Sequence, residues 1–126
     1  MLGSLDSDRV TRMVEQGYTQ LNKDSRVKKV YHIVLEYIDG CEMFDFIYAT
    51  GSFSENLCRY YFHQLVEGIE YMHEQGISHR DLRTQNILLD KRYNLVIANF
   101  GIATMKEISM TIEDIRMFSA PELLER

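Results

Sequence analysis

Apolar residues recur at intervals of three and four between residues 54 and 75, and this pattern predicts the longest helix of the chain. The spacing places the apolar positions on one helical face, which indicates a face that packs against a core. Ser54 is suited to cap the amino end of this helix, and Gly76 is suited to end it. The apolar positions are Leu57, Tyr61, Leu65, Ile69 and Met72.

The residues before this helix predict an antiparallel pair of strands followed by a short helix. An apolar run over residues 30–38 predicts one strand, and the polar residues 22–26 predict the turn before it. Residues 39–40 break the run, and residues 42–49 then predict a short helix that ends near Gly51. The other strand of the pair is indicated by Val10, Met13 and Val14.

Two short apolar segments with a polar loop between them predict a β-hairpin in the second half of the chain. The segments cover residues 87–89 and 95–98, and the loop covers residues 90–94. Asp81 precedes the hairpin and Asn99 follows it, so the pattern predicts these two residues at opposite ends of one hairpin.

Composition and charge limit the class of protein. A chain of 126 residues with 45% hydrophobic residues and one proline can bury a small core, and a single domain is expected. The net charge of −5 argues against binding to nucleic acid, which requires a basic surface. No stretch has the length and apolarity of a membrane span, so we expect a soluble cytoplasmic protein without membrane contact. Cys41 and Cys58 lie in segments predicted to be helical, which favours reduced thiols over a disulfide.

Three short motifs occur in a fixed order along the second half of the chain. They are His-Arg-Asp-Leu-Arg-Thr-Gln-Asn at residues 79–86, Asn-Phe-Gly at 99–101 and Ala-Pro-Glu at 120–122. In this order and spacing they resemble the catalytic loop and activation segment of a eukaryotic-type Ser/Thr protein kinase. Residues 33–44 are similar to the strand, hinge and first helix that follow in the calcium/calmodulin-dependent and AMP-activated group of these kinases.

The resemblance implies an α+β fold, in the form of an incomplete protein-kinase-like domain. The whole chain, 1–126, would form one partial domain, with residues 1–38 as a remnant of the N-terminal lobe and residues 39–126 as part of the C-terminal lobe. A complete kinase catalytic domain has two lobes and is much longer. Residues 1–5 resemble the last turn of the regulatory helix of the family.

The resemblance also assigns roles in phosphoryl transfer to the catalytic-loop residues. Asp81 matches the carboxylate that orients the attacking hydroxyl, and Asn86 matches a metal ligand. Arg83 stands where Ser/Thr kinases usually carry a lysine, so the charge is kept but a compact ammonium is replaced by a planar group. Asn99 stands where the family has an aspartate that holds magnesium, and a neutral amide cannot supply that charge. Asn86 and Asn99 therefore form a degenerate metal site.

ATP and Mg are the cofactors implied by the resemblance, and their binding is expected to be weak or absent. No Gly-x-Gly-x-x-Gly loop and no Val-Ala-x-Lys strand occurs in the printed sequence, and Lys23, Lys28 and Lys29 do not replace that lysine because they lie in or beside a polar turn. By resemblance, adenine would meet the hinge and its surroundings, and the ribose would lie near Glu42. The predicted nucleotide-binding residues are Leu35, Glu36, Ile38, Glu42 and Leu88.

Other family positions concern regulation and support of the site. Arg80 matches the arginine that binds a phosphorylated residue of the activation segment. Ser109 and Thr111 are candidate phosphorylation sites, and Asp114 and Ile115 replace the Gly-Thr pair that normally precedes the Ala-Pro-Glu motif. His79 and Phe100 belong to the apolar column that supports the active site. For His79 a structural role is favoured over a metal ligand, because no Cys or second His lies at ligand spacing.

These features predict a truncated, kinase-like domain, a pseudokinase without efficient phosphotransfer that acts through binding to a protein, with another kinase as the favoured partner. The loss of one preorganised electrostatic stabiliser commonly costs about 10²–10³-fold in rate, and several are missing here. An alternative is an active Ser/Thr kinase, with Asp81 as base, if the chain is an incomplete record or is complemented by another polypeptide. A product without function is a third hypothesis.

Overall fold

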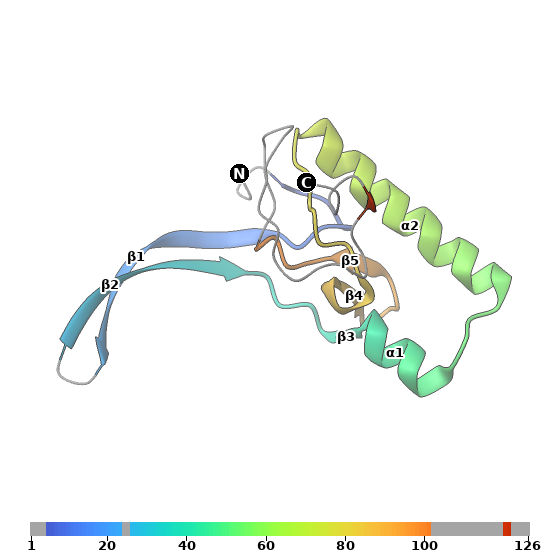
Figure 1. Ribbon diagram of the computed structural model, residues 1–126, viewed down its shortest axis with the longest axis horizontal. Coiled ribbons are helices and arrows are strands. Elements are labelled where there is room, and N and C mark those ends of the chain that lie inside the picture. Colours follow the sequence, from blue (N-terminus) through green and yellow to red (C-terminus); the bar gives the residue numbers. More distant parts are fainter. Residues whose placement is uncertain (1–4, 24–25, 102–119, 122–126) are drawn as a thin grey trace.

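The computed structural model describes residues 5–23, 26–101 and 120–121, and these form a mixed structure of two small antiparallel sheets and two α-helices (Figure 1). The first sheet is a long two-stranded arm, and the second is a short three-stranded sheet against which the helices pack. The elements in chain order are β1 (Met13–Lys23), β2 (Arg26–Leu35), β3 (Gly40–Glu42), α1 (Met43–Thr50), α2 (Glu55–Glu74), the 3-10 helix η2 (Thr84–Asn86), β4 (Ile87–Asp90) and β5 (Leu95–Ile97).

The arm consists of β1 and β2, paired antiparallel with Tyr18 opposite Tyr31. The prediction of an antiparallel pair is confirmed, but its bounds differ. The second strand ends at Leu35 instead of residue 38. The last hydrogen bond beside it runs from the Glu36 N–H to the carbonyl of Arg12, just before β1 begins, at 3.0 Å. Val10 does not belong to β1. It forms a parallel bridge with Ile97 of β5 instead.

The helix α2 follows the predicted pattern closely. Ser54 caps it by accepting a hydrogen bond from the Leu57 N–H at 3.4 Å. Gly76, at φ 69°, follows the helix in the left-handed conformation that glycine adopts without strain. The predicted short helix is present as α1, and Gly51, at φ 81°, follows it.

The three-stranded sheet has the order β3-β4-β5. The predicted hairpin of β4 and β5 is confirmed, and Asp90 holds its turn by accepting hydrogen bonds from the Arg92 and Asn94 N–H groups at 2.8 Å. The strand β3 was not predicted. It places Cys41 opposite Leu89 on an edge strand, so the prediction of a helical segment around Cys41 is wrong. Cys58 lies in α2 as predicted.

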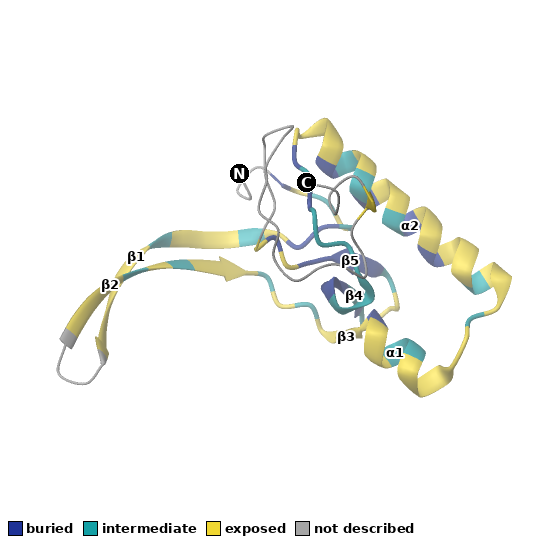
Figure 2. Ribbon diagram, viewed as in Figure 1, coloured by how far each residue is buried: buried dark blue, intermediate teal, exposed yellow. Residues whose placement is uncertain are grey.

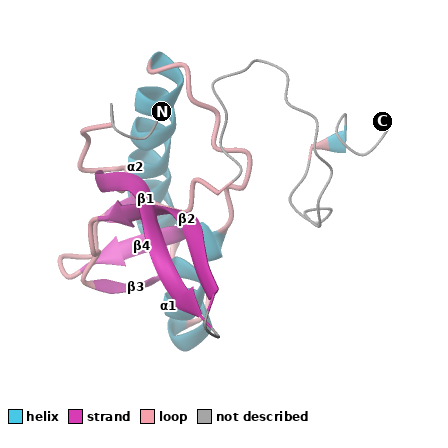
Figure 3. Ribbon diagram, turned by 90° about the vertical axis from the view of Figure 1, so that its left-hand side faces the viewer, coloured by secondary structure: helices cyan, strands magenta, loops and turns pink. Residues whose placement is uncertain are grey.

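The hydrophobic core lies between α2 and the three-stranded sheet (Figures 2 and 3). The N-terminal residues join it, since the Thr11 N–H donates to the Ile97 carbonyl at 2.9 Å and the Ile97 N–H donates to the Arg9 carbonyl at 2.8 Å. The arm lies outside this core and is largely exposed (Figure 2). The largest fully buried side chains of the core are Leu5, Val10, Met72, Ile77, Leu89, Leu95 and Ile97. Within the described ranges, no helix combines the length and apolarity needed to cross a membrane.

Candidate functional site

His79 anchors the segment that carries the candidate catalytic residues. Its imidazole is 2% exposed; Nε2 lies 2.8 Å from the Ala98 carbonyl, and Nδ1 lies 3.2 Å from the Asp81 N–H. Burial lowers the pKa of His79, so the neutral ring donates from Nε2 and accepts at Nδ1. The ring also packs against Phe100 at 4.9 Å between centroids. Both nitrogens are therefore satisfied within the fold, in the manner predicted for a structural histidine.

Asn86 connects the two ends of the β4–β5 hairpin. Its Nδ2 donates to the Asp81 carbonyl at 2.8 Å and to Asp81 Oδ2 at 2.7 Å. Its Oδ1 accepts from Asn99 Nδ2 at 2.9 Å. The prediction that Asp81 and Asn99 lie at opposite ends of the hairpin is wrong in space. The residues before and after an antiparallel hairpin meet at its open end, so Asn86 bridges both in one directed chain of hydrogen bonds.

Asp81 and Arg83 face each other next to this chain of hydrogen bonds. Asp81 Oδ1 and Arg83 Nε lie 3.6 Å apart, and each is a buried atom without a hydrogen-bond partner in the described part of the protein. Asp81 Oδ1 therefore accepts no hydrogen bond from a described residue, but it is buried against Arg83, which would have to move aside before a substrate hydroxyl could reach it.

The positions that would hold magnesium in the family do not fit that ion here. Mg²⁺ prefers carboxylate and phosphate oxygens in an octahedron, whereas Asn86 Oδ1, the oxygen available for coordination, is occupied by the Asn99 amide. Asn99, at φ 64°, adopts a left-handed conformation that asparagine tolerates, which directs its side chain to Asn86. No group of three or more His, Cys, Asp or Glu side chains suited to a metal occurs among the residues that the structure describes.

The predicted nucleotide-binding residues are only partly brought together. Glu42 and Leu88 are cross-strand neighbours of β3 and β4, and Leu35 ends β2 with 37% of its surface exposed. Within residues 36–39, the described backbone hydrogen bonds use the Glu36 N–H but neither the Glu36 carbonyl nor the Ile38 N–H. These two groups are the ones that adenine would meet by family resemblance, and neither is used by a described backbone hydrogen bond.

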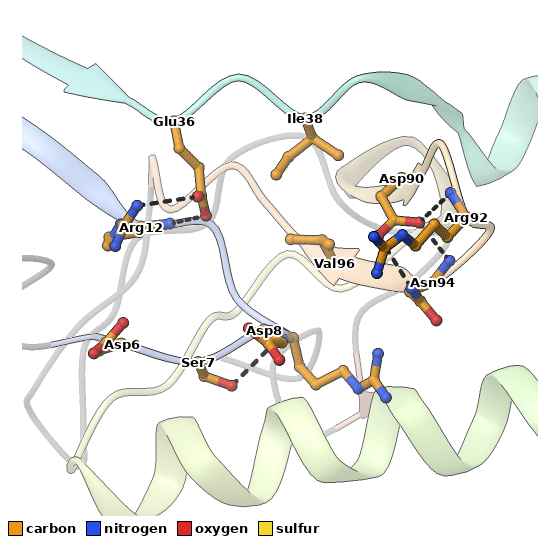
Figure 4. Close-up of a pocket in the computed structure, with 11 residues that line it drawn as sticks. Asp6, Ser7, Asp8, Arg12, Glu36, Ile38, Asp90, Arg92, Asn94 and Val96 are labelled. Atoms are coloured by element: carbon orange, nitrogen blue, oxygen red, sulfur yellow. Dashed lines mark hydrogen bonds and ion pairs between the residues drawn. The ribbon is translucent and has the colours of Figure 1, made fainter.

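A separate cavity of about 450 Å³ lies behind the hinge, and it does not include the catalytic-loop residues (Figure 4). Glu36 and Ile38 line it, but Leu35, Glu42 and Leu88 do not. On one side the Glu36 carboxylate accepts from the Arg12 N–H at 2.7 Å, and on the other side Asp90 and its turn close the wall. Burial is the largest single influence on Asp90 and raises its pKa, but the hydrogen bonds from Asn94 and Arg92 to its carboxylate, with the charge of Arg92, together lower the pKa below its ordinary value. The cavity is therefore lined mainly by ion-paired and turn-forming side chains.

The regulatory candidates are only partly described. Arg80 has φ 67°, a left-handed conformation that costs a non-glycine residue on the order of 1 kcal/mol, and the residue takes part in an interaction within the protein. Such strain persists where the surrounding fold enforces it. Ser109 and Thr111, together with Asp114 and Ile115, lie outside the described residues.

Gln64 is a positioning residue that the sequence pattern did not reveal. It is 4% exposed, and its Oε1 accepts from the Leu95 N–H at 2.7 Å and from Arg9 Nη1 at 3.0 Å. It thereby ties α2 to β5 and to the N-terminal segment, and Arg9 Nε also pairs with Glu67 at 2.9 Å. The sequence does contain one sign of this role, because Gln64 is a lone amide one turn after Tyr61 on the apolar face of the helix.

Comparison with known proteins gives a consistent result. The family model of the protein kinase domain matches residues 1–126. The chain is 49% identical over 84 residues to CBL-interacting serine/threonine-protein kinase 8 of Arabidopsis thaliana, which covers 67% of this chain and 19% of that protein. It is 40% identical over 105 residues to CBL-interacting protein kinase 26 of Oryza sativa subsp. japonica, covering 79% of this chain and 21% of that protein.

A third relative covers nearly the whole chain. Similarity to CBL-interacting protein kinase 32 of Oryza sativa subsp. japonica extends over a 146-residue alignment at 35% identity, covering 96% of this chain and 33% of that protein. The chain thus spans between about a fifth and a third of the length of these relatives.

Proposed function

The chain belongs to the protein kinase family, and on that premise we propose that these 126 residues form a pseudokinase-like domain that binds another protein and does not transfer phosphate efficiently. Its favoured partner is a second kinase-like chain. The proposal concerns this chain alone, since it spans at most about a third of the length of the relatives described above.

The observation that carries the proposal is the hydrogen bond from Asn99 Nδ2 to Asn86 Oδ1 at 2.9 Å. Two positions that hold magnesium in the family are occupied by neutral amides, and these amides are bonded to each other. Binding of a cation would require this bond to break and would gain no carboxylate from either residue. The neutral bridge therefore disfavours binding of metal-bound ATP.

The printed sequence supports the same proposal at the phosphate end of the site. No glycine-rich loop and no lysine in the Val-Ala-x-Lys context occurs within these 126 residues. Because a single preorganised electrostatic group is commonly worth about 10²–10³-fold in rate, restoring one of several missing groups leaves most of the deficit in place.

Two measurements on the purified chain test the proposal. Thermal-shift titration with Mg·ATP is expected to show no saturable stabilisation at sub-millimolar nucleotide. Transfer of radiolabelled phosphate to a generic basic protein is expected to be absent for the wild type and for Asn99→Asp. Asp81→Asn serves as the control that removes the candidate base. Turnover by the wild type or by Asn99→Asp that Asp81→Asn abolishes would overturn the proposal.

A specific observation favours an active Ser/Thr kinase as the second candidate. Asp81 accepts from Asn86 Nδ2 at 2.7 Å, and its Oδ1, buried against Arg83, accepts no hydrogen bond from a described residue. With Arg83 moved aside, this oxygen would be available to a substrate hydroxyl, as ATP-dependent phosphorylation of protein hydroxyls requires. This candidate requires the lysine and glycine-rich loop to come from further sequence or from another chain, and phosphotransfer by such a reconstituted protein would support it.

A further inference from the structure

One face of the β1–β2 arm carries exposed apolar side chains and one cation, beside the amides of Gln16, Gln20 and Asn22. Directly paired residues of antiparallel strands share a face, and the register pairs Tyr18 with Tyr31 and Gln20 with Lys29. Lys29 is the only charged side chain on this face among those that the structure describes. We call the following residues the arm face: Tyr18, Val27, Lys29, Tyr31 and Ile33.

The arm face is ordered by contacts within the arm but is not buried by them. The Tyr18 and Tyr31 rings meet edge to face at 5.0 Å, and Lys29 Nζ lies 4.5 Å from the centre of the Tyr18 ring. Tyr18 nevertheless remains 67% exposed. A two-stranded ribbon is marginally stable in water by itself, and contiguous exposed apolar surface of this kind marks an interaction site.

The outer side of α2 carries a second uncovered apolar surface. Cys58, Phe62, Val66, Ile69 and His73 follow one another at intervals of three and four, and we call them the helix stripe. Phe62 is 64% exposed and Val66 is 44% exposed.

A groove of about 570 Å³ runs along the carboxyl-terminal half of the helix stripe. Val66, Ile69 and His73 line it together with Glu70 and Glu74. The groove is thus an apolar surface with an acidic border.

The two surfaces have complementary charge. Of the glutamates of α2, Glu55 pairs with Arg59 and Glu67 pairs with Arg9, whereas Glu70 and Glu74 form no ion pair with any described residue. By sequence, the arm residues 13–35 contain four Lys or Arg and two Asp or Glu, a formal charge of +2 in a chain whose net charge is −5. A cationic apolar arm and an acidic apolar groove attract each other, whereas two arms repel.

The lengths also match, and the two surfaces of one molecule do not meet. Strand β2 has 10 residues and α2 has 20, which correspond to about 33 Å at 3.3 Å per strand residue and about 30 Å at 1.5 Å per helical residue. Figure 1 shows the arm extending away from the body of the molecule, on the side opposite α2. The arm of one copy is therefore positioned to reach α2 of another copy and not its own.

We propose that the arm face of one copy binds the helix stripe of a second copy, with Lys29 placed beside Glu70 and Glu74. This inference rests on the proposed function, in which the chain acts by binding a kinase-like partner, and it identifies that partner as the chain itself. The contact joins two different surfaces, so each copy keeps one free arm and one free stripe, and further copies add head to tail.

Sedimentation velocity of the 126-residue chain at increasing concentration tests the proposal, with circular dichroism to verify folding. Self-association is expected for the wild type. Lys29→Glu is expected to weaken it at least about tenfold, and so is Glu70→Lys combined with Glu74→Lys. Lys28→Glu is the matched control, because Lys28 lies on the other face of the arm, opposite Leu21; it is expected to leave the association constant within about twofold. An equimolar mixture of the two weakened variants is expected to associate again, because each intact surface then finds its intact counterpart.

Three results would overturn the proposal. The first is a wild-type chain that stays monomeric at all concentrations, which would show that the helix stripe does not bind a second copy. The second is association that Lys29→Glu weakens and the α2 variant does not, which indicates arm-to-arm pairing. The third is failure of the mixture to associate. Phosphotransfer is measured separately, so catalytic activity in an associating chain would refute the proposed function without refuting this contact.

Discussion

Substitution of Asn99 by aspartate tests how the amide bridge holds the candidate site together. In the wild type Asn99 Nδ2 donates to Asn86 Oδ1 at 2.9 Å, and both amide hydrogens of Asn86 are directed to Asp81 at 2.7 and 2.8 Å. In Asn99→Asp an unprotonated carboxylate oxygen would lie where the donor was. Asn86 cannot turn its amide to satisfy this oxygen without placing its own oxygen against the Asp81 carboxylate.

The expected cost follows from these contacts. The variant loses one hydrogen bond and leaves the oxygen of the buried Asn86 without its donor and facing a carboxylate on the exposed residue 99, for which about 1–3 kcal/mol of unfolding free energy is a reasonable magnitude. For a chain of this size 1 kcal/mol corresponds to about 4 °C, so Tm is expected to fall by about 4–12 °C in buffer without divalent cations. The loss is large because the net stability of a small domain is only about 5–15 kcal/mol.

Magnesium is expected to recover part of this loss in the variant alone. Ligand oxygens at adjacent corners of a magnesium octahedron, with bonds of 2.0–2.1 Å, lie about 2.9 Å apart. The Asn99–Asn86 distance of 2.9 Å in the wild type matches that edge, so the variant offers a carboxylate and an amide oxygen at the correct spacing. Binding to the folded state alone raises Tm as the cation concentration increases.

The assay is thermal unfolding with and without millimolar magnesium, followed by fluorescence and by circular dichroism. Asn56→Asp is the matched control, since it makes the same chemical change at an exposed position of α2; its effect should stay within about 0.5 kcal/mol and be independent of magnesium. If Asn99→Asp melts at the wild-type temperature in the absence of divalent cations, the amide bridge does not contribute to stability and the reasoning is refuted.

Three further predictions concern the support of the site. Burial lowers the pKa of His79 in the folded state below the unfolded value of about 6.5. Between these two pKa values the unfolded state binds more protons than the folded state. Denaturant unfolding should therefore show that the contribution of His79 to stability is complete above about pH 6.5 and decreases as the pH falls below it. Gln64→Leu leaves the buried Leu95 N–H unpaired and should cost about 1–3 kcal/mol by the same measurement. Gly68→Ala should destabilise by about 1–3 kcal/mol despite a better helix propensity, because its Cβ would lie 2.7 Å from Ile97 Cδ1.

Each of these predictions has a control in the same chain. His79→Gln should flatten the acid dependence, whereas His73→Gln at the exposed end of α2 should not, and an unchanged profile in His79→Gln would contradict the assignment. Gln64→Glu retains an acceptor for Leu95 and should cost less than Gln64→Leu; equal losses would show that the hydrogen bond is unimportant. In Gly17→Ala the added Cβ would meet only the His32 ring, whose nearest atom, Cε1, lies at 3.4 Å, an ordinary contact. A loss equal to that of Gly68→Ala would therefore refute the packing argument.

The elements that could be predicted from the sequence are those specified by neighbouring residues. Ser54 and Gly76 mark the two ends of α2 by capping, and Asp90 closes the β4–β5 turn through its own side chain. The strand β3 was missed because its three residues acquire strand structure only by pairing with β4, which lies more than 40 residues later in the chain. For the same reason Cys41 was wrongly assigned to a helix.

The candidate site shows the same division between local identity and long-range geometry. The motif singled out Asp81, Asn86 and Asn99, and the fold brings these three residues together. The motif did not predict how they are arranged, because the direction of each amide hydrogen bond depends on the partner that the fold supplies. Gln64 was missed because the sequence shows only a polar residue on an apolar helical face. Its role depends on the Leu95 N–H, which the fold places within hydrogen-bond distance.

The hydrogen bond between Asn99 and Asn86 also makes the conformation of the catalytic loop independent of bound metal. With an aspartate at position 99, the carboxylate would need a cation to lie beside Asn86 Oδ1, so the geometry of the loop would depend on bound metal. With Asn99 the donor is built into the chain, and Asn86 can hold Asp81 while no ligand is bound. A loop that is ordered without nucleotide presents a constant surface to a protein partner, which is the property that a binding domain requires and a catalytic switch does not.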